Sequence, residues 1–391
     1  MERRDSITCA KLAEDLLHLL EESYFELSPN TTIYNSVLNA WSRAGKSEND
    51  AKASVYAASR AFALLQHMLD KGHEERQLRR NFLPAPNESS FLLVINAFAH
   101  AANAAIKAGN ISDAENAANA AEELLQRLEE QSLETRQIAL SCRGNVVRIL
   151  ASLAGLTMSQ SGYAARAEAL LTTMAREAGQ LPIDVIYFNA VLDAWARDLS
   201  RKDTDQSMNL LSRPHTLLME LIGGKYNAIP DNSSYNHVIR ALYAPWTSRQ
   251  KVGKEDDRRK AWDMVFSVYS NMSERHRGSC MPDAHTYLHM FKALACLWPT
   301  DTSASSGERL VLCRDIFHSC CQNGQLTKTT FWVITTFLDS STLMHLLAHE
   351  MGEQDVSKQL QHIPTDLLYT HIPAEWSRNG RNCKPLNRHK Q

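Results

Sequence analysis

Apolar residues recur along this chain at intervals of three and four, and one phrase returns several times. The stretch "IPDNSSYNHVIRALY" (229–243) is one copy: a Pro-Asp turn, an aromatic residue, an Asn, and an apolar run. Aligned on the aromatic, five copies carry apolar residues at +3, +4 and +7 and an Ala at +6. These positions share one face of an α-helix, so each copy predicts a helix, called here an A helix. The five aromatic residues are Tyr34, Phe91, Phe188, Tyr235 and Tyr287.

A second phrase, Ala-x-x-Leu-Leu-x-x-Met/Leu, alternates with the first and predicts a second set of helices, called B helices. The clearest copies are "AFALLQHM", "AAEELLQRL" and "AEALLTTM". The copies start at Ala13, Ala61, Ala121, Ala167, Pro214, Ala261 and Cys313. Differences between successive numbers run from 46 (Ala121 to Ala167) to 60 (Ala61 to Ala121). Such regular spacing is typical of a repeat array in which stacked hairpins bury a continuous core.

The predicted organisation is all-α, an α-solenoid of about six long antiparallel A–B hairpins with partial units at both ends. It begins with an orphan B helix at 11–27, which suggests a chain that starts within a repeat. The repeat array covers 28–340, a closing helix (Leu343–Gln361) and linker cover 341–375, and a basic tail covers 376–391. The third A helix lacks the aromatic and is assigned to "CRGNVVRILASLAG" (142–155), with its register open; a weak seventh A helix is "TKTTFWVITTFL".

The extra length of each repeat is predicted to lie in polar loops between the A and B helices. The stretches "DLSRKDTDQSMN", "APWTSRQKVGKEDDRR" and "WPTDTSASSGER" are rich in polar and turn-forming residues. For the first of these loops, we expect protease cleavage within Asp198–Arg213 while the flanking helices stay protected.

At "PDNSSYNHVIRAL…AWDMVFSVYSNM" the chain resembles the pentatricopeptide repeat (PPR) family, as it does at "SPNTTIYNSVLNAWSRAG" and "PIDVIYFNAVLDAWARD". The resemblance covers roughly residues 11 to 340. The repeats here are longer than the family's usual ones, and the third repeat matches poorly. The resemblance implies a right-handed solenoid that binds single-stranded RNA in a mitochondrion or plastid. There it would support RNA processing, stability or translation.

The resemblance also implies which residues contact bases: the one after the aromatic and the last one of the same repeat, one base per repeat. These pairs are Asn35 with Asn87, Asn189 with Asp231, and Asn236 with Asp283. The pair in the first repeat differs in kind from the pairs in the fourth and fifth repeats. Asn–Asp resembles the family's uracil-preferring pair, so the fourth and fifth repeats imply a pyrimidine preference, whereas Asn–Asn resembles a looser pyrimidine pair. The second and sixth repeats carry Leu92 and Leu288 instead, which cannot hydrogen-bond a base.

A purely structural interpretation stands beside this one. Asp or Asn four residues before the aromatic can cap the A helix without any RNA. Repeated Asn one residue after the aromatic is harder to explain by helix formation, since Asn is a poor helix former, but inter-repeat hydrogen bonding would account for it. Phosphate contacts need cations. The sparse candidates are Arg43, Arg197, Arg240 and Lys292.

Composition and charge limit the classes of function that the sequence favours. The formal charge is −2, so no strong global field favours nucleic acid or membranes. The eight cysteines include no Cys-x-x-Cys pair, which favours buried thiols in a reducing compartment. No long uninterrupted apolar run predicts a membrane span, and the N-terminus resembles no signal or transit peptide.

No set of residues indicates catalysis, a cofactor or a metal. His345 and His349 are spaced as zinc ligands, but no Glu follows His345 as a zinc-protease motif requires. "GGK" at 223–225 lacks the remainder of a phosphate-binding loop. The sequence therefore predicts a binding protein rather than an enzyme. The alternative to RNA is a scaffold that holds a protein partner, favoured by the near-neutral charge and by Leu92 and Leu288.

Overall fold

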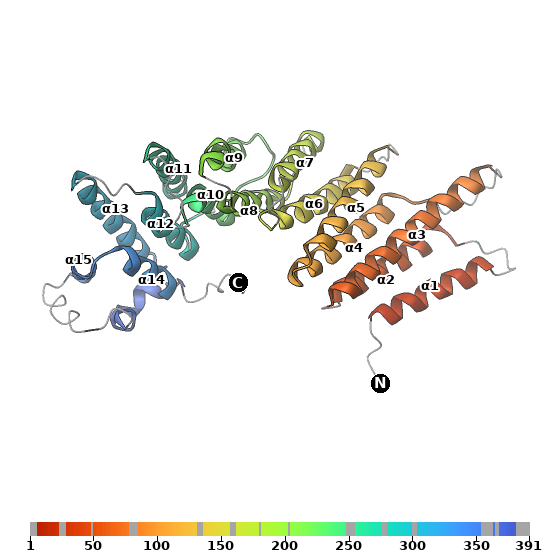
Figure 1. Ribbon diagram of the computed structural model, residues 1–391, viewed down its shortest axis with the longest axis horizontal. Helices are drawn as coiled ribbons and strands as arrows, with labels where there is room; N and C mark the ends of the chain where they lie inside the picture. Colours follow the sequence, from red (N-terminus) through yellow and green to blue (C-terminus); the bar gives the residue numbers. More distant parts are fainter. Residues whose placement is uncertain are drawn as a thin grey trace. The chain divides into compact units, whose positions relative to one another are not determined.

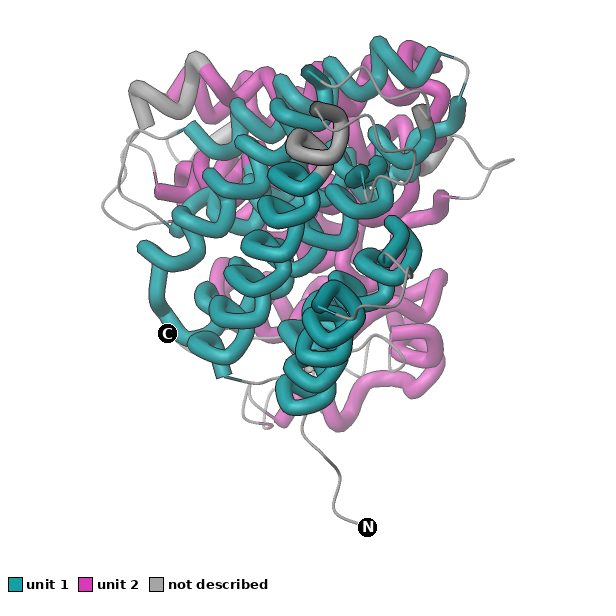
Figure 2. Tube along the Cα trace, turned by 90° about the vertical axis from the view of Figure 1, so that its right-hand side faces the viewer, with its two compact units in different colours: residues 1–194 teal, residues 195–391 magenta. Residues whose placement is uncertain are grey.

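The chain was analysed as a computed structural model in which all described elements are helices. The structure describes residues 6–22, 29–47, 50–77, 85–130, 136–156, 162–179, 181–201, 204–247, 255–274, 280–298, 303–352, 363 and 367–380. The chain divides into two compact units, Met1–Ala194 and Trp195–Gln391, coloured separately in Figure 2. Each unit is described by itself below.

The first unit is a row of helices, shown from red to yellow in Figure 1. Its elements are α1 (Ser6–Glu22), α2 (Thr31–Ser47), α3 (Ala51–Gln77), α4 (Glu88–Lys107), α5 (Ile111–Glu130), α6 (Arg136–Leu153), α7 (Tyr163–Ala178) and the greater part of α8 (Val185–Arg201). From α1 to α7, helices adjacent in the sequence pack on each other, and α4 also contacts both α2 and α6. The A helices α2, α4 and α6 therefore form one continuous layer, and the third A helix predicted near 142–155 is confirmed as α6.

The second unit repeats the alternation. Its elements are the end of α8, then α9 (Thr204–Ile222), α10 (Asn232–Tyr243), α11 (Glu255–Glu274), α12 (Ala284–Leu297), α13 (Ser303–Gln322), α14 (Lys328–Phe337) and α15 (Ser340–Met351), with 3-10 turns η1 (Ala244–Trp246), η2 (Leu368–His371) and η3 (Ala374–Ser377). The A helices α10, α12 and α14 again contact one another in order. The weak seventh A helix is confirmed as α14.

The aromatic residue of each A helix anchors the core. Tyr34, Phe91, Phe188, Tyr235 and Tyr287 are each at most 2% exposed, as the periodicity predicts. The Ala at +6 is buried in the same way at Ala97, Ala194, Ala241 and Ala293. A large ring beside a small side chain lets the next helix approach closely while the ring fills the space between repeats.

Residues four before the aromatic begin the A helices by capping them. Asn87, Asp231 and Asp283 are the N-caps of α4, α10 and α12, and each forms a reciprocal capping box with a Ser or Thr three residues on. This confirms the structural interpretation of these positions. Thr327 caps α14 in the same register, so the cap belongs to the repeat rather than to one residue type.

The structure differs from the sequence prediction at the connections between A and B helices. Residues 198–201 end α8 and 204–213 begin α9, so the loop prediction is wrong for these residues, and we expect them to be protected from protease. Residues 202–203 lie outside the described part. Polar sequences occur on helices as well as in loops, so polarity alone did not separate the two. The connections after α2 and α4 are also short: α3 begins at Ala51 and α5 at Ile111. Gly109, with φ of 76°, makes the sharp turn after α4.

The ends of the array also differ from the predicted boundaries. The orphan B helix is α1, which begins at Ser6 rather than at 11. The predicted closing helix is α15, Ser340–Met351, with Gly352 as its C-cap, and residues 353–361 lie outside the described residues. Residues 376–380 are no free tail: Asn379 N and Gly380 N donate to Gly324 O at 2.8 and 2.9 Å. Residues 381–391 lie outside the described part.

One described helix, α4, is long and apolar enough to cross a membrane by length and composition alone. Half of its most apolar stretch is buried, and α4 is in contact with α2, α3, α5 and α6. The buried core helix of a helical array has this same composition, so the finding is weak evidence for a membrane span.

Two glycines in A helices provide a matched test of inter-helix packing. A Cβ at Gly144 of α6 would lie 2.7 Å from Tyr187 Oη of α8 and closer still to the ring, whereas a Cβ at Gly45 of α2 would meet atoms only at 3.5 Å or beyond. We expect Gly144→Ala to lower the free energy of unfolding by about 1 kcal/mol, because strain outweighs the gain in helix propensity. Gly45→Ala is expected to be neutral or stabilising. Urea denaturation of both variants checks this, and equal effects would contradict the packing.

Candidate functional site

The junction between the first and second repeats brings together the predicted pair Asn35 and Asn87. Asn35 Nδ2 donates to Asn87 Oδ1 at 3.2 Å, and Ser90 Oγ donates to Asn35 Oδ1 at 2.7 Å. Asn87 Oδ1 also accepts from Ser90 N at 3.1 Å as the cap of α4. The cap therefore positions the Asn35 amide, which is half-buried and lies on the preceding A helix.

The junction between the fifth and sixth repeats has the same arrangement with a carboxylate. Asn236 Nδ2 donates to Asp283 Oδ1 at 3.1 Å, and Thr286 N donates to the same oxygen at 2.8 Å. Asn236 is 8% exposed, and its Oδ1 has no hydrogen-bond partner among the described residues. A buried amide oxygen without a donor is costly, so this junction holds an acceptor that an incoming N–H group would satisfy.

The third predicted pair spans the two compact units, and its contact is therefore not described. Asn189 is half-buried on α8 in the first unit. Asp231 belongs to the second unit, where its Oδ1 accepts from Ser234 N at 2.9 Å as the cap of α10. Asp231 therefore has the capping role that its position predicts.

Two features of this register were missed from the sequence. In the third repeat, Asn145 Nδ2 donates to Asn96 Oδ1 at 2.6 Å. Asn96 is five residues after Phe91, and the hydrogen bond joins the A helices α4 and α6. In the seventh repeat the residue after the aromatic is Trp332, which is 65% exposed. The sequence pattern that could have identified Trp332 was the weak copy of the A-helix phrase in the seventh repeat. The leucines at this position, Leu92 and Leu288, are half-buried.

Cations on successive A helices lie close enough to affect one another. In the first unit, burial lowers the pKa of His100, and Lys46 and Arg148 lower it further. In the second unit, burial lowers the pKa of Lys292, and so does the Arg240 guanidinium. These effects indicate that basic side chains of neighbouring A helices lie near one another. Of the other candidate cations, Arg43 is exposed and Arg197 is half-buried.

Buried histidine and cysteine groups serve the packing. Burial, with Arg240 and Lys292 nearby, lowers the pKa of His289 well below its usual range, and its Nδ1 contacts Tyr243 Oη at 2.8 Å. Burial raises the pKa of the Cys313 thiol to about 12. Within the described residues the cysteines are free thiols, and no group of three or more His, Cys, Asp or Glu side chains could hold a metal ion.

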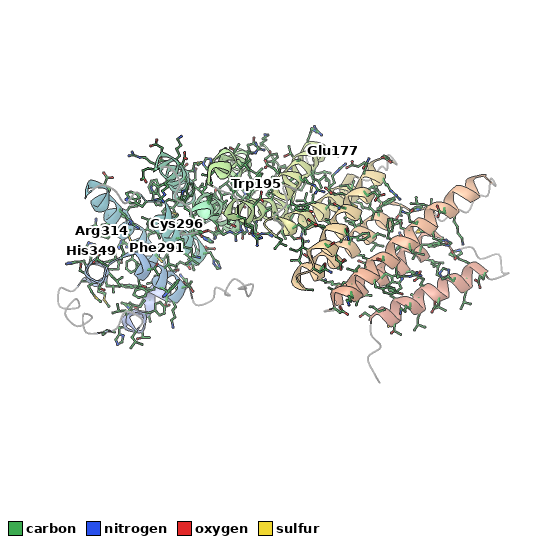
Figure 3. All side chains as sticks on the ribbon, viewed as in Figure 1. Glu177, Trp195, Phe291, Cys296, Arg314 and His349 are labelled. Carbon is green, nitrogen blue, oxygen red and sulfur yellow. The ribbon has the colours of Figure 1, made fainter. Side chains whose placement is uncertain are left out.

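Two cavities lie away from these junctions. One, of about 620 Å³, has a largely apolar lining from α13 and α15 that includes Leu310 and Val311. Arg314, His345 and the exposed His349 also line it, and Figure 3 labels Arg314 and His349.

The second cavity, of about 650 Å³, lies in the first unit beside a buried arginine. Arg143 is paired there with Glu129 at 3.0 Å and with Glu177 at 2.6 Å. These ion pairs join α5, α6 and α7, and their two carboxylates neutralise the arginine. The cavity therefore offers little attraction to an anion.

The comparisons with known proteins give no identity. No protein-family model matches the chain, and searches of curated proteins and of solved structures found no match. The residues and their geometry therefore carry the functional argument.

Proposed function

We propose that this chain is a PPR-like α-solenoid, right-handed as in that family, that binds single-stranded RNA and does no catalysis. The observation that carries the proposal is the hydrogen bond between a predicted base-contacting Asn and the last residue of its own repeat in two of the three predicted pairs. It is present at Asn35–Asn87 and Asn236–Asp283. The resemblance supplies the ligand class, and these contacts support it, because they join the two positions that the resemblance pairs.

The cap makes an Asn amide selective by fixing which way it faces. Asp283 is an acceptor, so it selects the amide Nδ2 of Asn236 and directs Oδ1 away. A second Nδ2 hydrogen and Oδ1 then remain for a base. Uracil offers an N–H donor beside a carbonyl acceptor, the complement of that pair. Since Oδ1 of Asn236 is buried, a base must displace its neighbours in the fifth repeat, and at the half-buried Asn35 it must displace Ser90 Oγ from Oδ1.

Two further features suit RNA. Cations on adjacent A helices, such as Arg240 and Lys292, suit the phosphates of a strand that follows the array. Trp332 offers an exposed ring on which a base can stack. We also propose, from the resemblance alone, a mitochondrial or plastid location and a role in RNA processing, stability or translation.

A protein-binding scaffold is the second candidate. The apolar cavity between α13 and α15, with the exposed Leu310 and Val311 at its lining, favours it because such surfaces commonly mark protein contacts. The RNA proposal is preferred because the cavity lies outside the repeated register, and the paired amides lie within it.

The proposal is tested by selecting ligands from a random single-stranded RNA pool at ~150 mM salt. We expect enrichment of sequences containing uracil. Asn236→Leu is expected to weaken binding to the selected RNA about tenfold and to remove the preference at one position, as loss of a base contact does. Leucine already occupies this register at Leu92 and Leu288, so the fold should tolerate it.

Asn271→Leu is the matched control, since Asn271 is a half-buried Asn on the B helix α11 whose Nδ2 donates to the backbone atom Ser267 O at 2.9 Å. It should bind RNA as the wild type does. A pool without enrichment, or equal losses in both variants, would reject base reading and favour the scaffold.

A further inference from the structure

The first helix, α1, has one face packed against the array and another that is apolar and exposed. Ala10, Glu14 and Leu17 form the packed face. There, Glu14 accepts hydrogen bonds from Trp41 Nε1 at 3.0 Å and Arg60 Nη2 at 2.6 Å. This face joins α1 to both α2 and α3, so α1 is held in a defined orientation.

The opposite face is a stripe of four leucines, called here the leucine stripe. Leu12, Leu16, Leu19 and Leu20 are 42%, 61%, 63% and 39% exposed. Their spacing places them on one side of the helix. Single exposed leucines are ordinary on protein surfaces, but four on one helix face form a contiguous patch of the kind that mediates association.

The equivalent positions of the next B helices show what such a stripe is suited to. Leu16 and Leu20 correspond to Leu64 and Met68 of α3, which are 2% and 0% exposed. The corresponding residues in α5 are likewise buried. Both α3 and α5 contact an A helix on each side in the sequence. The leucine stripe therefore has the composition of a surface that another helix covers.

The charges beside the stripe select the partner. Lys11, Asp15 and Glu22 are exposed along one edge of α1. When two copies of α1 pair antiparallel, Leu12 of one faces Leu16 of the other. The charged edges of the two helices then lie next to each other, which brings Lys11 of one copy near Asp15 of the other. Glu22 then lies beside the N-terminus of the second α1, where a carboxylate is favoured by the helix dipole.

We propose that α1 is a homodimerisation helix, which pairs antiparallel with α1 of a second copy of this chain through the leucine stripe. The pairing is isologous, so each contact occurs twice and the assembly closes at two chains. Two helices of this length bury less surface than a standard stable interface, so we expect a weak, concentration-dependent dimer.

The test is sedimentation velocity across a concentration series, without RNA and at low ionic strength, where exposed charges are least screened. We expect the mass to rise from 44.0 kDa toward twice that value. Leu16→Glu should abolish the rise with unchanged circular dichroism, because Leu16 is exposed in the monomer. Leu181→Glu is the matched control: Leu181 is 39% exposed but lies outside α1, and this variant should dimerise normally.

A charge exchange tests the antiparallel register. Asp15→Lys alone should weaken the dimer about tenfold by opposing Lys11, and Asp15→Lys with Lys11→Glu should restore it. A mass of 44.0 kDa at every concentration would overturn the proposal and leave the stripe to a different partner. A dimer insensitive to Leu16→Glu, or a double variant without recovery, would overturn it as well. None of these outcomes depends on RNA binding.

Discussion

Replacing Trp41 with Ala is expected to lower the free energy of unfolding by about 4 kcal/mol, as removal of a fully buried aromatic side chain does. Trp41 is 0% exposed, and its ring packs edge-on against Tyr56 with centroids 5.8 Å apart. Its Nε1 donates to Glu14 Oε2 at 3.0 Å. The substitution therefore opens a cavity and also deprives a buried carboxylate of a donor, which adds a second cost.

Hydrogen exchange of α1 to α3, together with urea denaturation, measures this effect, because repeat arrays need not unfold in one step. Trp332→Ala is the matched control. Trp332 is 65% exposed, so its loss should change stability by no more than about 0.5 kcal/mol. Similar losses for the two tryptophans would contradict the role of Trp41 in joining α1 to α2.

Glu21→Gln is expected to destabilise the protein by about 2–3 kcal/mol at pH 7 and by much less in acid. Burial by itself raises the pKa of Glu21, but hydrogen bonds from Lys71, Tyr34 and His67 outweigh it and lower the pKa to about 2. Lys71 Nζ lies 2.7 Å and His67 Nε2 3.0 Å from Oε1. Each unit of pKa difference is worth about 1.4 kcal/mol, reduced here for solvent screening.

The sign of the pH dependence follows from the depressed pKa. Stability from ionised Glu21 is fully present above the unfolded-state pKa near 4.5 and is lost as pH falls toward 2. The difference between wild type and Glu21→Gln should therefore shrink by more than half between pH 7 and pH 3. Urea denaturation at both pH values measures it. Glu22→Gln is the control, because Glu22 is exposed; a gap that stays constant with pH would contradict the assignment.

The site was predictable in part because its positions are repeated. The resemblance paired Asn35 with Asn87 and Asn236 with Asp283, the repeated phrase fixed their positions, and both contacts are present. The atoms that surround these amides were not predictable from the sequence. The unsatisfied Oδ1 of Asn236 depends on which side chains of neighbouring helices enclose it, and so does the lowered pKa of Lys292. Burial and electrostatic surroundings are properties of packed helices rather than of one segment.

The sequence by itself determined the helices, because apolar periodicity, capping residues and small Ala positions act within one turn or one hairpin. It determined which aromatics are buried, since each lies on the apolar face of its own helix. Only the tertiary structure decided which polar stretches are helical, as at the end of α8 and the start of α9, and that residues 376–380 pack on the turn at Gly324. It alone exposed the leucine stripe of α1, because Leu16 and Leu64 belong to the same phrase and differ only in whether another helix covers them.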